Sequence, residues 1–493
     1  MRLRATHFVG KRGVEKLSEK EGTVMTKKYK VVVAGAGPGG CIFARDLARK
    51  GLEVVVYERG VYETMGHDWS DAVERRGLAE AGFELPPEST LNRGPLVKMP
   101  GSDETPGQIF EPHAYPDMEV WAPDYSCKKM IKFNYITTDR RKLGKILVDQ
   151  AREAGAVIQF GHEVVDILQS GGTSLEDAMV KGAKVKNLES GEVFDVSADV
   201  VADDTGFGAL LRTRLPDATG MASPFRDEEF ANVHRTVRKR RKDVDDTIVD
   251  HYRYGYYTGY QWVQYLNDDQ IDTGAGVRAD PSNPDPKDIV EEFISRHPSI
   301  SDEVVRGGGG VCLVGKSPYS LVAGGFVVIG DAASQTITMT GCGAGGAMAG
   351  GRLAAEVVAR AAQEGRNDIA ALWPYNWKWF VESGRGAHYA ALNALRNIVQ
   401  DLSHEDISFL FRKDILNGEM LTASINGTFM VPDLKTMVLT LARGISRPGL
   451  LLKLNKATTV GTKILKHYLK YPESWNPAAF DAWRARADGL FGK

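Results

Sequence analysis

Glycines at fixed spacing near the N-terminus are the first residues of this chain whose pattern suggests ligand binding. Gly35, Gly37 and Gly40 follow a short apolar run at residues 31–34 in G-x-G-x-x-G spacing. In such a turn the first glycine permits the tight bend, the second lets a pyrophosphate approach the backbone, and the third lets a helix pack closely on the strand. The helix that follows would offer free N–H groups and a partial positive charge to the phosphates.

A carboxylate completes this motif at the end of the next apolar run. Glu58 lies 23 residues after Gly35 and closes the run at residues 54–57. An acid about 20 residues beyond the glycines is expected to bind a ribose hydroxyl. A lone G-x-G-x-x-G is a weak signal, but one placed between two strand-like runs and closed by an acid predicts dinucleotide binding. Residues 30–59 are therefore expected to form strand, helix and strand, and they leave NAD and FAD both open.

A second set of residues, far downstream, favours FAD. Asp331 follows a buried-strand run at residues 327–329, where its carboxylate is well placed to accept a hydrogen bond from a ribityl hydroxyl. The glycine-rich turn at 341–346 opens a helical segment, so its N–H groups and the helix dipole would stabilise an anionic reduced flavin. A flavin dinucleotide is long, so its site needs residues at both ends. The glycine turn after residue 34 would hold one end, and Asp331 with the turn at 341–346 would hold the other.

Other catalytic arrangements are missing from the sequence. Histidines such as His67 and His234 are scattered without metal-ligand spacing, and each is expected to be structural or exposed. The four cysteines form no C-x-x-C pair, which argues against zinc or a disulfide framework and suits a reducing cytosol. No second G-x-G-x-x-G follows a strand, so we expect electrons from transient NADPH, a ferredoxin or a quinol.

The order of the motifs along the chain resembles the FAD-dependent oxidoreductases of the aromatic-hydroxylase superfamily. The glycine motif ending in Glu58 comes first, followed by Arg140, which opens an R-x-x-L-x-x-x-L helix. Asp-Thr-Gly at residues 204–206 and Gly-Asp-Ala-Ala at residues 330–333 complete the order. Within this superfamily the chain looks most like the geranylgeranyl reductases, especially the archaeal enzymes that act on digeranylgeranylglyceryl phospholipids.

An aromatic motif and the C-terminal sequence make the resemblance specific to the geranylgeranyl reductases. The family carries Y-x-W-x-F-P and, a few residues later, G-x-G. The matching residues here are Tyr260, Trp262, Gly274 and Gly276. Gln264 and Tyr265 replace the family's Phe and Pro. The text RGISRPGLLLKLNK near the C-terminus also looks like the helical tail of these reductases, so the resemblance covers residues 28–490.

The resemblance implies an FAD site built from several segments. The residues that would hold the ADP half are Gly35, Gly37, Gly39, Gly40, Glu58 and Arg59. Arg140 would approach the pyrophosphate or ribose, and Asp331 would approach the ribityl chain. Gly343 and Ala344 would lie at the isoalloxazine.

One stretch departs from the family pattern. The W-S-D-A-V text aligns with a family stretch Cys-Gly-Asp-x-Val near the flavin, which adds Ser70 and Ala72 to the cofactor-binding residues. Trp69 stands where many members have cysteine, so the role of a thiol does not transfer. A bulky indole would instead shape the pocket or cover one flavin face. We therefore count Trp69 with Tyr260 and Trp262 as candidate catalytic residues.

Tyr260 and Trp262 are expected to project to the same side of a strand, because side chains repeat every two residues. Two aromatic faces on one side of a sheet suit a prenyl chain lying over a flavin. Ordinary packing in a sheet core is the alternative interpretation. Tyr260 is also a candidate proton donor, although nothing in the sequence identifies that group.

The function that these motifs and the resemblance predict is FAD-dependent hydrogenation of C=C bonds in geranylgeranyl chains, with archaeal membrane-lipid precursors as substrates. A flavin monooxygenase or halogenase would share the flavin motifs, but no halogenase-type W-x-W-x-I-P occurs. A flavoprotein that passes electrons to a quinone is a third possibility. An isolated alkene is a poor hydride acceptor, so a water-excluding pocket and close alignment must supply much of the catalysis.

These elements predict an α/β fold with a Rossmann-like FAD-binding domain (GR2-type), an antiparallel-sheet substrate domain and a C-terminal helical region. The expected bounds are a mobile tail at 1–27, an FAD-binding domain at 28–82, 130–221 and 311–370, a substrate domain at 83–129 and 222–310, and a helical domain at 371–493.

Composition and charge limit the classes of partner that we expect. The chain has 493 residues, a formal charge of −2 and a pI near 6.6, which argues against a nucleic-acid partner. No run of about 18 apolar residues occurs, so no membrane span is expected and we predict a cytoplasmic protein.

Two basic stretches receive different interpretations. Residues 435–470 combine lysines and arginines with leucines and contain no acid, which is typical of amphipathic helices that meet anionic lipid headgroups at the inner face of the cell membrane. A solvated face over a helical core is the alternative. The charged run at 235–242 precedes several aspartates, so we expect a solvated surface rather than a polyanion site.

Overall fold

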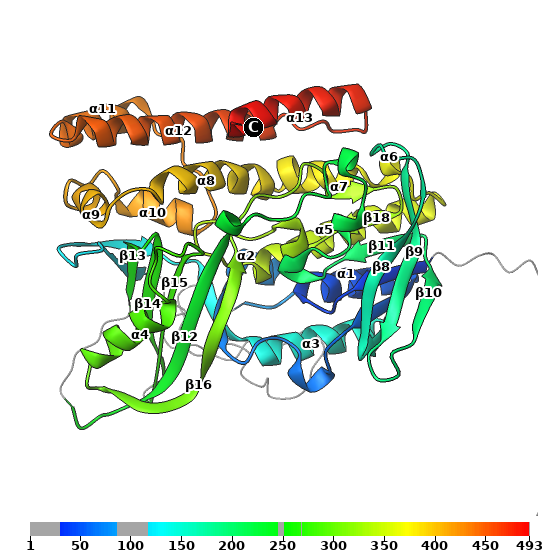
Figure 1. Ribbon diagram of the computed structural model, residues 1–493, viewed down its shortest axis with the longest axis horizontal. Coiled ribbons are helices and arrows are strands. Elements are labelled where there is room, and N and C mark those ends of the chain that lie inside the picture. Colours follow the sequence, from blue (N-terminus) through cyan, green and yellow to red (C-terminus); the bar gives the residue numbers. More distant parts are fainter. Residues whose placement is uncertain (1–29, 86–116, 245–250, 268, 493) are drawn as a thin grey trace, which may run out of the picture.

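The computed structural model describes residues 30–85, 117–244, 251–267 and 269–492. The expected tail at 1–27 and most of the stretch at 83–129 lie outside the described residues. Figure 1 shows the described part as layers, with a row of C-terminal helices above two main sheets.

A six-stranded sheet carries the N-terminal motif, in the order β17-β18-β11-β1-β2-β7. Its strands are β1 (Lys30–Ala34), β2 (Glu53–Glu58), β7 (Val157–Phe160), β11 (Val200–Asp203), β17 (Val322–Ala323) and β18 (Phe326–Val328). All pairs are parallel except β17 with β18. Val32 pairs with Val55 on one side and Val201 on the other, as continuous apolar runs in a sheet interior require.

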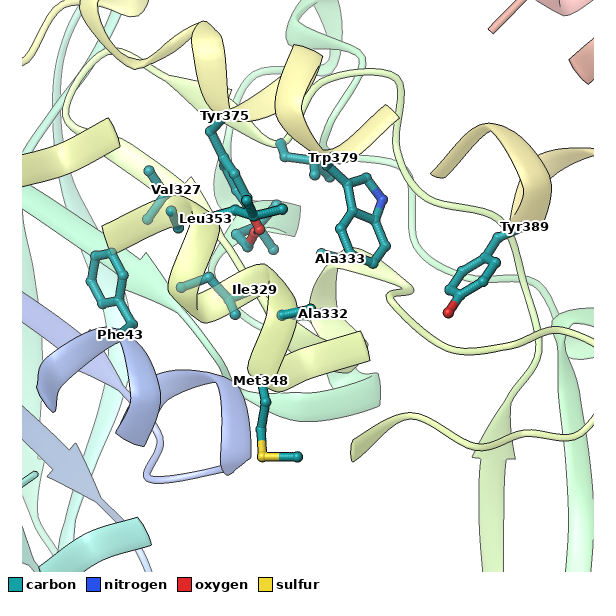
Figure 2. Packing of buried hydrophobic residues seen from close by; sticks show 14 of the residues in the cluster. Phe43, Val327, Ile329, Ala332, Ala333, Met348, Leu353, Tyr375, Trp379 and Tyr389 are labelled. Atoms are coloured by element: carbon teal, nitrogen blue, oxygen red, sulfur yellow. The ribbon is translucent and has the colours of Figure 1, made fainter. Parts of the chain in front are cut away.

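Helices α1 (Pro38–Ala48), α3 (Arg140–Glu153) and α5 (Ala344–Gln363) pack beside this sheet, and α1 contacts both of the others. The α1–α5 contact is close, because a methyl group added at Gly351 of α5 would overlap the backbone oxygen of Gly39 in α1. Figure 2 shows the apolar core around α5, where Leu353 lies near Val327 and Tyr375.

The second main sheet has seven strands in the order β16-β12-β15-β14-β13-β4-β5. They are β4 (Asp117–Trp121), β5 (Lys128–Lys132), β12 (Phe230–Arg240), β13 (His251–Tyr256), β14 (Gly259–Asn267), β15 (Gln270–Arg278) and β16 (Ile300–Leu313). The pairs are antiparallel except β13 with β4. Helix α4 (Pro286–Ser295) packs on β12 and β15.

Smaller elements complete the region around these sheets. They are the three-stranded sheet of β8 (His162–Gly171), β9 (Ala178–Asn187) and β10 (Val193–Ser197), the pair of β3 (Ser70–Glu74) and β6 (Tyr135–Asp139), helix α2 (Arg75–Glu80) and the short helix η7 (Gly330–Ala333).

The C-terminal region is helical, as predicted. Its helices are α6 (Ile369–Leu372), α7 (Pro374–Trp377), η8 (Lys378–Glu382), α8 (Arg385–Val399), α9 (His404–Arg412), α10 (Gly418–Ile425), α11 (Leu434–Gly444), α12 (Pro448–Tyr468) and α13 (Pro477–Phe491). Helix α12 lies along α8, which separates it from the sheets (Figure 1). Within the described residues, no helix is long and apolar enough to cross a membrane.

The fold class is therefore the predicted one, but the domain limits remain a proposal. Strand β5 runs through the proposed limit between residues 129 and 130, and β16 runs through the limit between residues 310 and 311. Limits at the ends of these strands agree better with the hydrogen-bonded ladders.

The charged run at 235–242 differs from the expectation of a solvated surface. It begins within β12, between β15 and β16, and Arg235 and Arg238 are each only 7% exposed. Asp272 forms an ion pair with Arg235, and Glu291 forms one with Arg238. Buried guanidinium groups are tolerated here because carboxylates on neighbouring elements compensate their charges.

The α1–α5 contact yields a stability prediction. Gly351→Ala is expected to lower the free energy of unfolding by about 1–3 kcal/mol, because the new methyl group meets backbone that has little freedom to move. Urea unfolding of the FAD-saturated protein measures this.

Gly489→Ala is the matched control, because Gly489 lies in α13 with open space around it. This change is expected to be neutral or to stabilise the protein by up to about 1 kcal/mol. Equal unfolding midpoints for the two variants would contradict the close packing of α1 on α5.

Candidate functional site

A cavity of about 860 Å³ lies between the six-stranded and seven-stranded sheets. Loops after β1, β11 and β18 and the cavity-facing side of β12 to β15 contribute to its lining. Nine of the predicted site residues line it: Gly37, Trp69, Ala72, Arg140, Tyr260, Trp262, Asp331, Gly343 and Ala344. Segments distant in sequence thus meet around one space.

Parallel strand order explains why the loops meet. Strands β18, β11, β1 and β2 are neighbours, so their carboxyl ends lie at one edge of the sheet, where ligands bind in such folds. Gly35 follows β1 with φ of +101°, a conformation that L side chains rarely adopt. Asp204 follows β11, and Asp331 follows β18 within η7.

The Asp204 side chain packs closely against the glycine turn, a contact that its position in the sequence did not predict. Its Oδ2 accepts a hydrogen bond of 2.9 Å from the backbone N–H of Gly40. A methyl group added at Gly37 would lie 2.6 Å from Asp204 Oδ2, and one at Gly330 would lie 2.6 Å from Oδ1. Burial raises the pKa of Asp204 well above its usual value, and Asp331 raises it further. The neutral form that this shift favours repels a pyrophosphate less than a carboxylate does.

Glu58 lies directly behind the turn. Its two carboxylate oxygens accept hydrogen bonds from the backbone N–H groups of Ala36, at 2.8 Å, and Gly60, at 2.7 Å. Each oxygen keeps further acceptor capacity for a ribose hydroxyl. Arg59 is exposed, and Ser70 pairs with Asp139 in the β3–β6 ladder. Gly35, Gly39, Gly40, Glu58 and Arg59 do not line the cavity themselves.

The opposite end of a flavin would meet Asp331 and α5. Asp331 Oδ1 accepts a hydrogen bond of 3.2 Å from Thr336 Oγ1. A methyl group added at Gly343 would lie 2.9 Å from the same Oδ1, so a larger residue there would push the carboxylate aside. Burial raises the pKa of Asp331, and Thr336 and Arg140 act against that shift. Helix α5 begins at Ala344 without a side-chain cap, which leaves its first N–H groups open to a ligand.

These features meet the requirements of FAD. Two helices, α1 and α5, begin at the cavity with no cap from the residue before each helix, although Asp204 already accepts the Gly40 N–H of α1. Glycine rather than a larger residue stands at each approach to the backbone. The cavity edge therefore offers N–H donors for phosphates and, separately, for a flavin ring. Carboxyl groups for two sets of hydroxyls lie at Glu58 and Asp331.

A chain of alternating charges runs from the cofactor side to the second sheet. Arg140 Nη1 lies 3.2 Å from Asp71 Oδ2, and Arg235 Nη1 lies 3.9 Å from Asp71 Oδ1. Arg235 in turn pairs with Asp272, which is fully buried. The Arg235–Asp272 pair has no counterpart among the predicted site residues. The position of Asp272, two residues before the first glycine of the G-x-G motif, was the sequence signal that could have identified this pair.

Tyr260 and Trp262 face the cavity from β14, as the alternation predicted. Their ring centroids lie 5.7 Å apart. Tyr260 donates its hydroxyl proton to the carbonyl of Thr340 at 2.6 Å, and the Trp262 indole N–H donates to Asp272 Oδ2 at 3.2 Å. Burial raises the pKa of Tyr260 well above its usual value. Both aromatic rings are therefore held in place by their polar ends.

Two glycines on the neighbouring strand, β15, lie opposite the two aromatic residues of β14. Gly274 pairs with Trp262, and a methyl group added at Gly274 would overlap the indole ring. Gly276 pairs with Tyr260, and a methyl group there would make only an ordinary contact of 3.6 Å with Val233. The Trp262 ring therefore leaves no space for a side chain at Gly274, whereas Gly276 has space for a methyl group.

Trp69 lies at the cofactor side, where its ring stacks on His67 with centroids 4.4 Å apart. Both residues line the cavity. His67 is exposed, as expected, yet its contact with Trp69 gives it a part in the cavity wall. The sequence offered no signal for that contact.

Comparisons with known proteins show which proteins this chain resembles. An FAD binding domain model matches residues 118–252. A digeranylgeranylglycerophospholipid reductase of Sulfolobus acidocaldarius is 24% identical over 470 residues, which are 94% of this chain and 97% of that protein. A second protein of that name, from Methanopyrus kandleri, is 26% identical over 79% of this chain and 92% of its own length.

Solved structures show the same fold. A geranylgeranyl bacteriochlorophyll reductase-like protein from Thermoplasma acidophilum has a TM-score of 0.65 at 17% identity, covering 87% of this chain and 99% of its own. A flavin-dependent brominase has a TM-score of 0.57 at 17% identity, covering 86% of this chain and 100% of its own. The cofactor is FAD. The motif-based resemblance is confirmed: this chain is an FAD-dependent oxidoreductase related to the archaeal digeranylgeranylglycerophospholipid reductases.

Proposed function

We propose that this protein hydrogenates C=C bonds in the geranylgeranyl chains of lipid precursors such as digeranylgeranylglycerophospholipids. The observation that carries this proposal is a single cavity that joins the flavin-binding loops to the aromatic side of the seven-stranded sheet. The names of the relatives support the same substrate class. For the electron donor we propose a transient partner, which is NADPH, a ferredoxin or a quinol.

The protein's contribution to the reaction is positioning and exclusion of water. Bound FAD, once reduced, would supply a hydride equivalent to one alkene carbon, and an acid or a water molecule would supply the proton to the other. Tyr260 and Trp262 would hold the prenyl chain against the flavin, and the room left over Gly276 would admit it. Because an isolated alkene is a poor acceptor, close alignment in a dry cavity has to lower the barrier.

Tyr260 fits a binding role better than the role of proton donor. Its hydroxyl proton is already donated to Thr340, and burial raises its pKa, which makes the phenol a weak acid. Trp262 has no acidic proton to give, and its indole N–H is bound by Asp272. Trp69 would close the cofactor side of the cavity together with His67.

We also propose that α11 and α12 dock on an anionic lipid surface, through the region at 435–470. Helix α11 and the residue that follows it, Ile445, carry a stripe of apolar side chains at helical spacing: Leu434, Val438, Leu441 and Ile445 are 77%, 56%, 59% and 78% exposed. Lys453, Lys456 and Lys463 are exposed on α12. Apolar side chains beside a basic face fit the interface of an anionic bilayer.

This surface adjoins the cavity. Arg447, between α11 and α12, pairs with Asp406 of α9 at 2.7 Å. The next residue of α9, Ile407, lines the cavity, as does Leu410. A lipid drawn from the bilayer would therefore travel a short distance from the docking surface to the site.

The proposed reaction is tested with dithionite-reduced holoenzyme and digeranylgeranylglyceryl phosphate, followed by mass spectrometry. We expect the lipid to gain two hydrogens for each double bond reduced. Oxygen incorporation with NADPH would indicate a monooxygenase, and rapid quinone reduction with an unchanged lipid would indicate an electron carrier. Either result would contradict the proposed function.

Gly274→Ala tests the aromatic wall. We expect kcat/KM for the prenyl substrate to fall about 10-fold, because the new methyl group displaces the Trp262 ring that aligns the chain. FAD content is expected to stay at the wild-type level. Gly276→Ala, two residues away on β15, is the matched control and should cause a smaller loss. Similar values of kcat/KM for both variants would contradict the proposed role of Trp262 in aligning the prenyl chain.

Membrane docking is tested by sedimentation with anionic liposomes. Reversing the charges of Lys453, Lys456 and Lys463 to Glu is expected to weaken sedimentation, and Leu441→Asp should do the same through the apolar stripe. The control reverses three exposed lysines elsewhere, at Lys50, Lys181 and Lys287. Sedimentation that is unchanged by both α11 and α12 variants, or equally weakened by the control, would contradict the docking surface.

A further inference from the structure

A buried arginine without a counter-ion lines the cavity on its α8 side. Arg396 is 7% exposed, and its Nη1 has no hydrogen-bond partner. The Gln400 amide, turned so that its oxygen faces the guanidinium, accepts from Nη2 at 2.6 Å and from Nε at 3.0 Å. Among the described residues, no carboxylate forms an ion pair with Arg396.

A second arginine lines the same part of the cavity. Arg278 ends β15, and its Nε is buried without a partner. Its Nη1 lies 3.6 Å from Asp401, whose side chain is 69% exposed and whose charge is therefore largely screened. Burial lowers the pKa of Arg396 to about 10, and the like charge of Arg278 contributes to that shift. Arg396 therefore remains cationic at neutral pH.

Burying a cation is costly unless an anion compensates it. Glu229 acts on Arg396 only at longer range, and Tyr254 is a neutral phenol at neutral pH. The two guanidinium groups thus form a positive pocket inside a cavity whose neighbouring lining, at Val399, Ile407 and Leu410, is apolar. A ligand that carries both an anion and a hydrocarbon chain would satisfy this arrangement.

The register of the sheet places this pocket away from Trp262. Arg278 and Gly274 lie on the same side of β15, four residues apart, and Gly274 pairs with Trp262. At about 3.4 Å per residue, this separates the two positions by roughly 14 Å along the strand. Tyr260, opposite Gly276, lies between them.

We propose that Arg396 and Arg278 bind the phosphate group of the lipid substrate, so that the prenyl chain extends from this anchor past Tyr260 to Trp262. The proposal rests on the proposed function, because it assumes that the cavity takes a prenyl lipid. Arginine suits this role, since its planar fork pairs two N–H groups with phosphate oxygens. The anchor would also set which double bond reaches the flavin.

The test compares geranylgeranyl phosphate with geranylgeraniol as substrates of reduced holoenzyme. Arg396→Met is expected to lower kcat/KM for the phosphate about 10-fold or more, through KM, and to leave the alcohol nearly unchanged. Arg396→Lys should recover part of the loss. Arg360→Met, an exposed position on α5, is the matched control and should behave as wild type. An unchanged ratio of phosphate to alcohol in Arg396→Met would overturn the proposal.

Binding measurements separate this proposal from the reaction itself. Quenching of tryptophan fluorescence in oxidised holoenzyme reports affinity for geranylgeranyl phosphate whether or not turnover occurs. Weaker binding in Arg396→Met, with FAD content and thermal unfolding as in wild type, supports the anchor even if no alkene is reduced. A second measurement uses inorganic phosphate as a competitor of geranylgeranyl phosphate. If low millimolar phosphate displaces the lipid phosphate from wild type but not from Arg396→Met, the anion site does not need the lipid chain. Equal affinity of both proteins for the lipid phosphate would contradict the anchor.

Discussion

The packing of glycine backbone around the Asp204 carboxyl group is the constraint on which the rest of the site depends. Gly37 and Gly40 approach it from the turn after β1, and Gly330 approaches it from η7, so three segments distant in sequence meet at one side chain. A side chain at any of these glycines would separate the segments. The same contact fixes the spacing between the ADP end of the flavin site and Asp331, and therefore the place where a flavin ring meets the second sheet.

A second constraint acts across the cavity. The Asp71 carboxylate lies between Arg140 and Arg235, and Arg235 pairs with the buried Asp272 that also accepts the Trp262 N–H. This chain of charges links the start of α3 to the aromatic wall. The cofactor side and the substrate side are thus coupled through the half-exposed Asp71, and the buried Arg235–Asp272 pair at the substrate side is costly to disturb. The position of Trp262 follows from that network as much as from apolar packing.

The sequence predicted the elements whose signal is local. The apolar runs of β1 and β2, the glycine turn and the alternation that puts Tyr260 beside Trp262 depend on near neighbours in the chain. Pairings between distant segments leave no such local pattern. Arg235 was expected in solvent because its neighbours are charged, and only the register with β15 reveals Asp272 beside it. Arg396 lies on an amphipathic helix, where the pattern does not show that its charge faces a cavity without a counter-ion.

The central claim is that one cavity holds both the flavin and the alkene. Anaerobic stopped-flow mixing of reduced holoenzyme with digeranylgeranylglyceryl phosphate tests it most directly, because flavin absorbance reports electron transfer with no other acceptor present. The account predicts that the oxidised flavin spectrum returns in proportion to the double bonds reduced. Flavin that stays reduced in the presence of saturating lipid would contradict it.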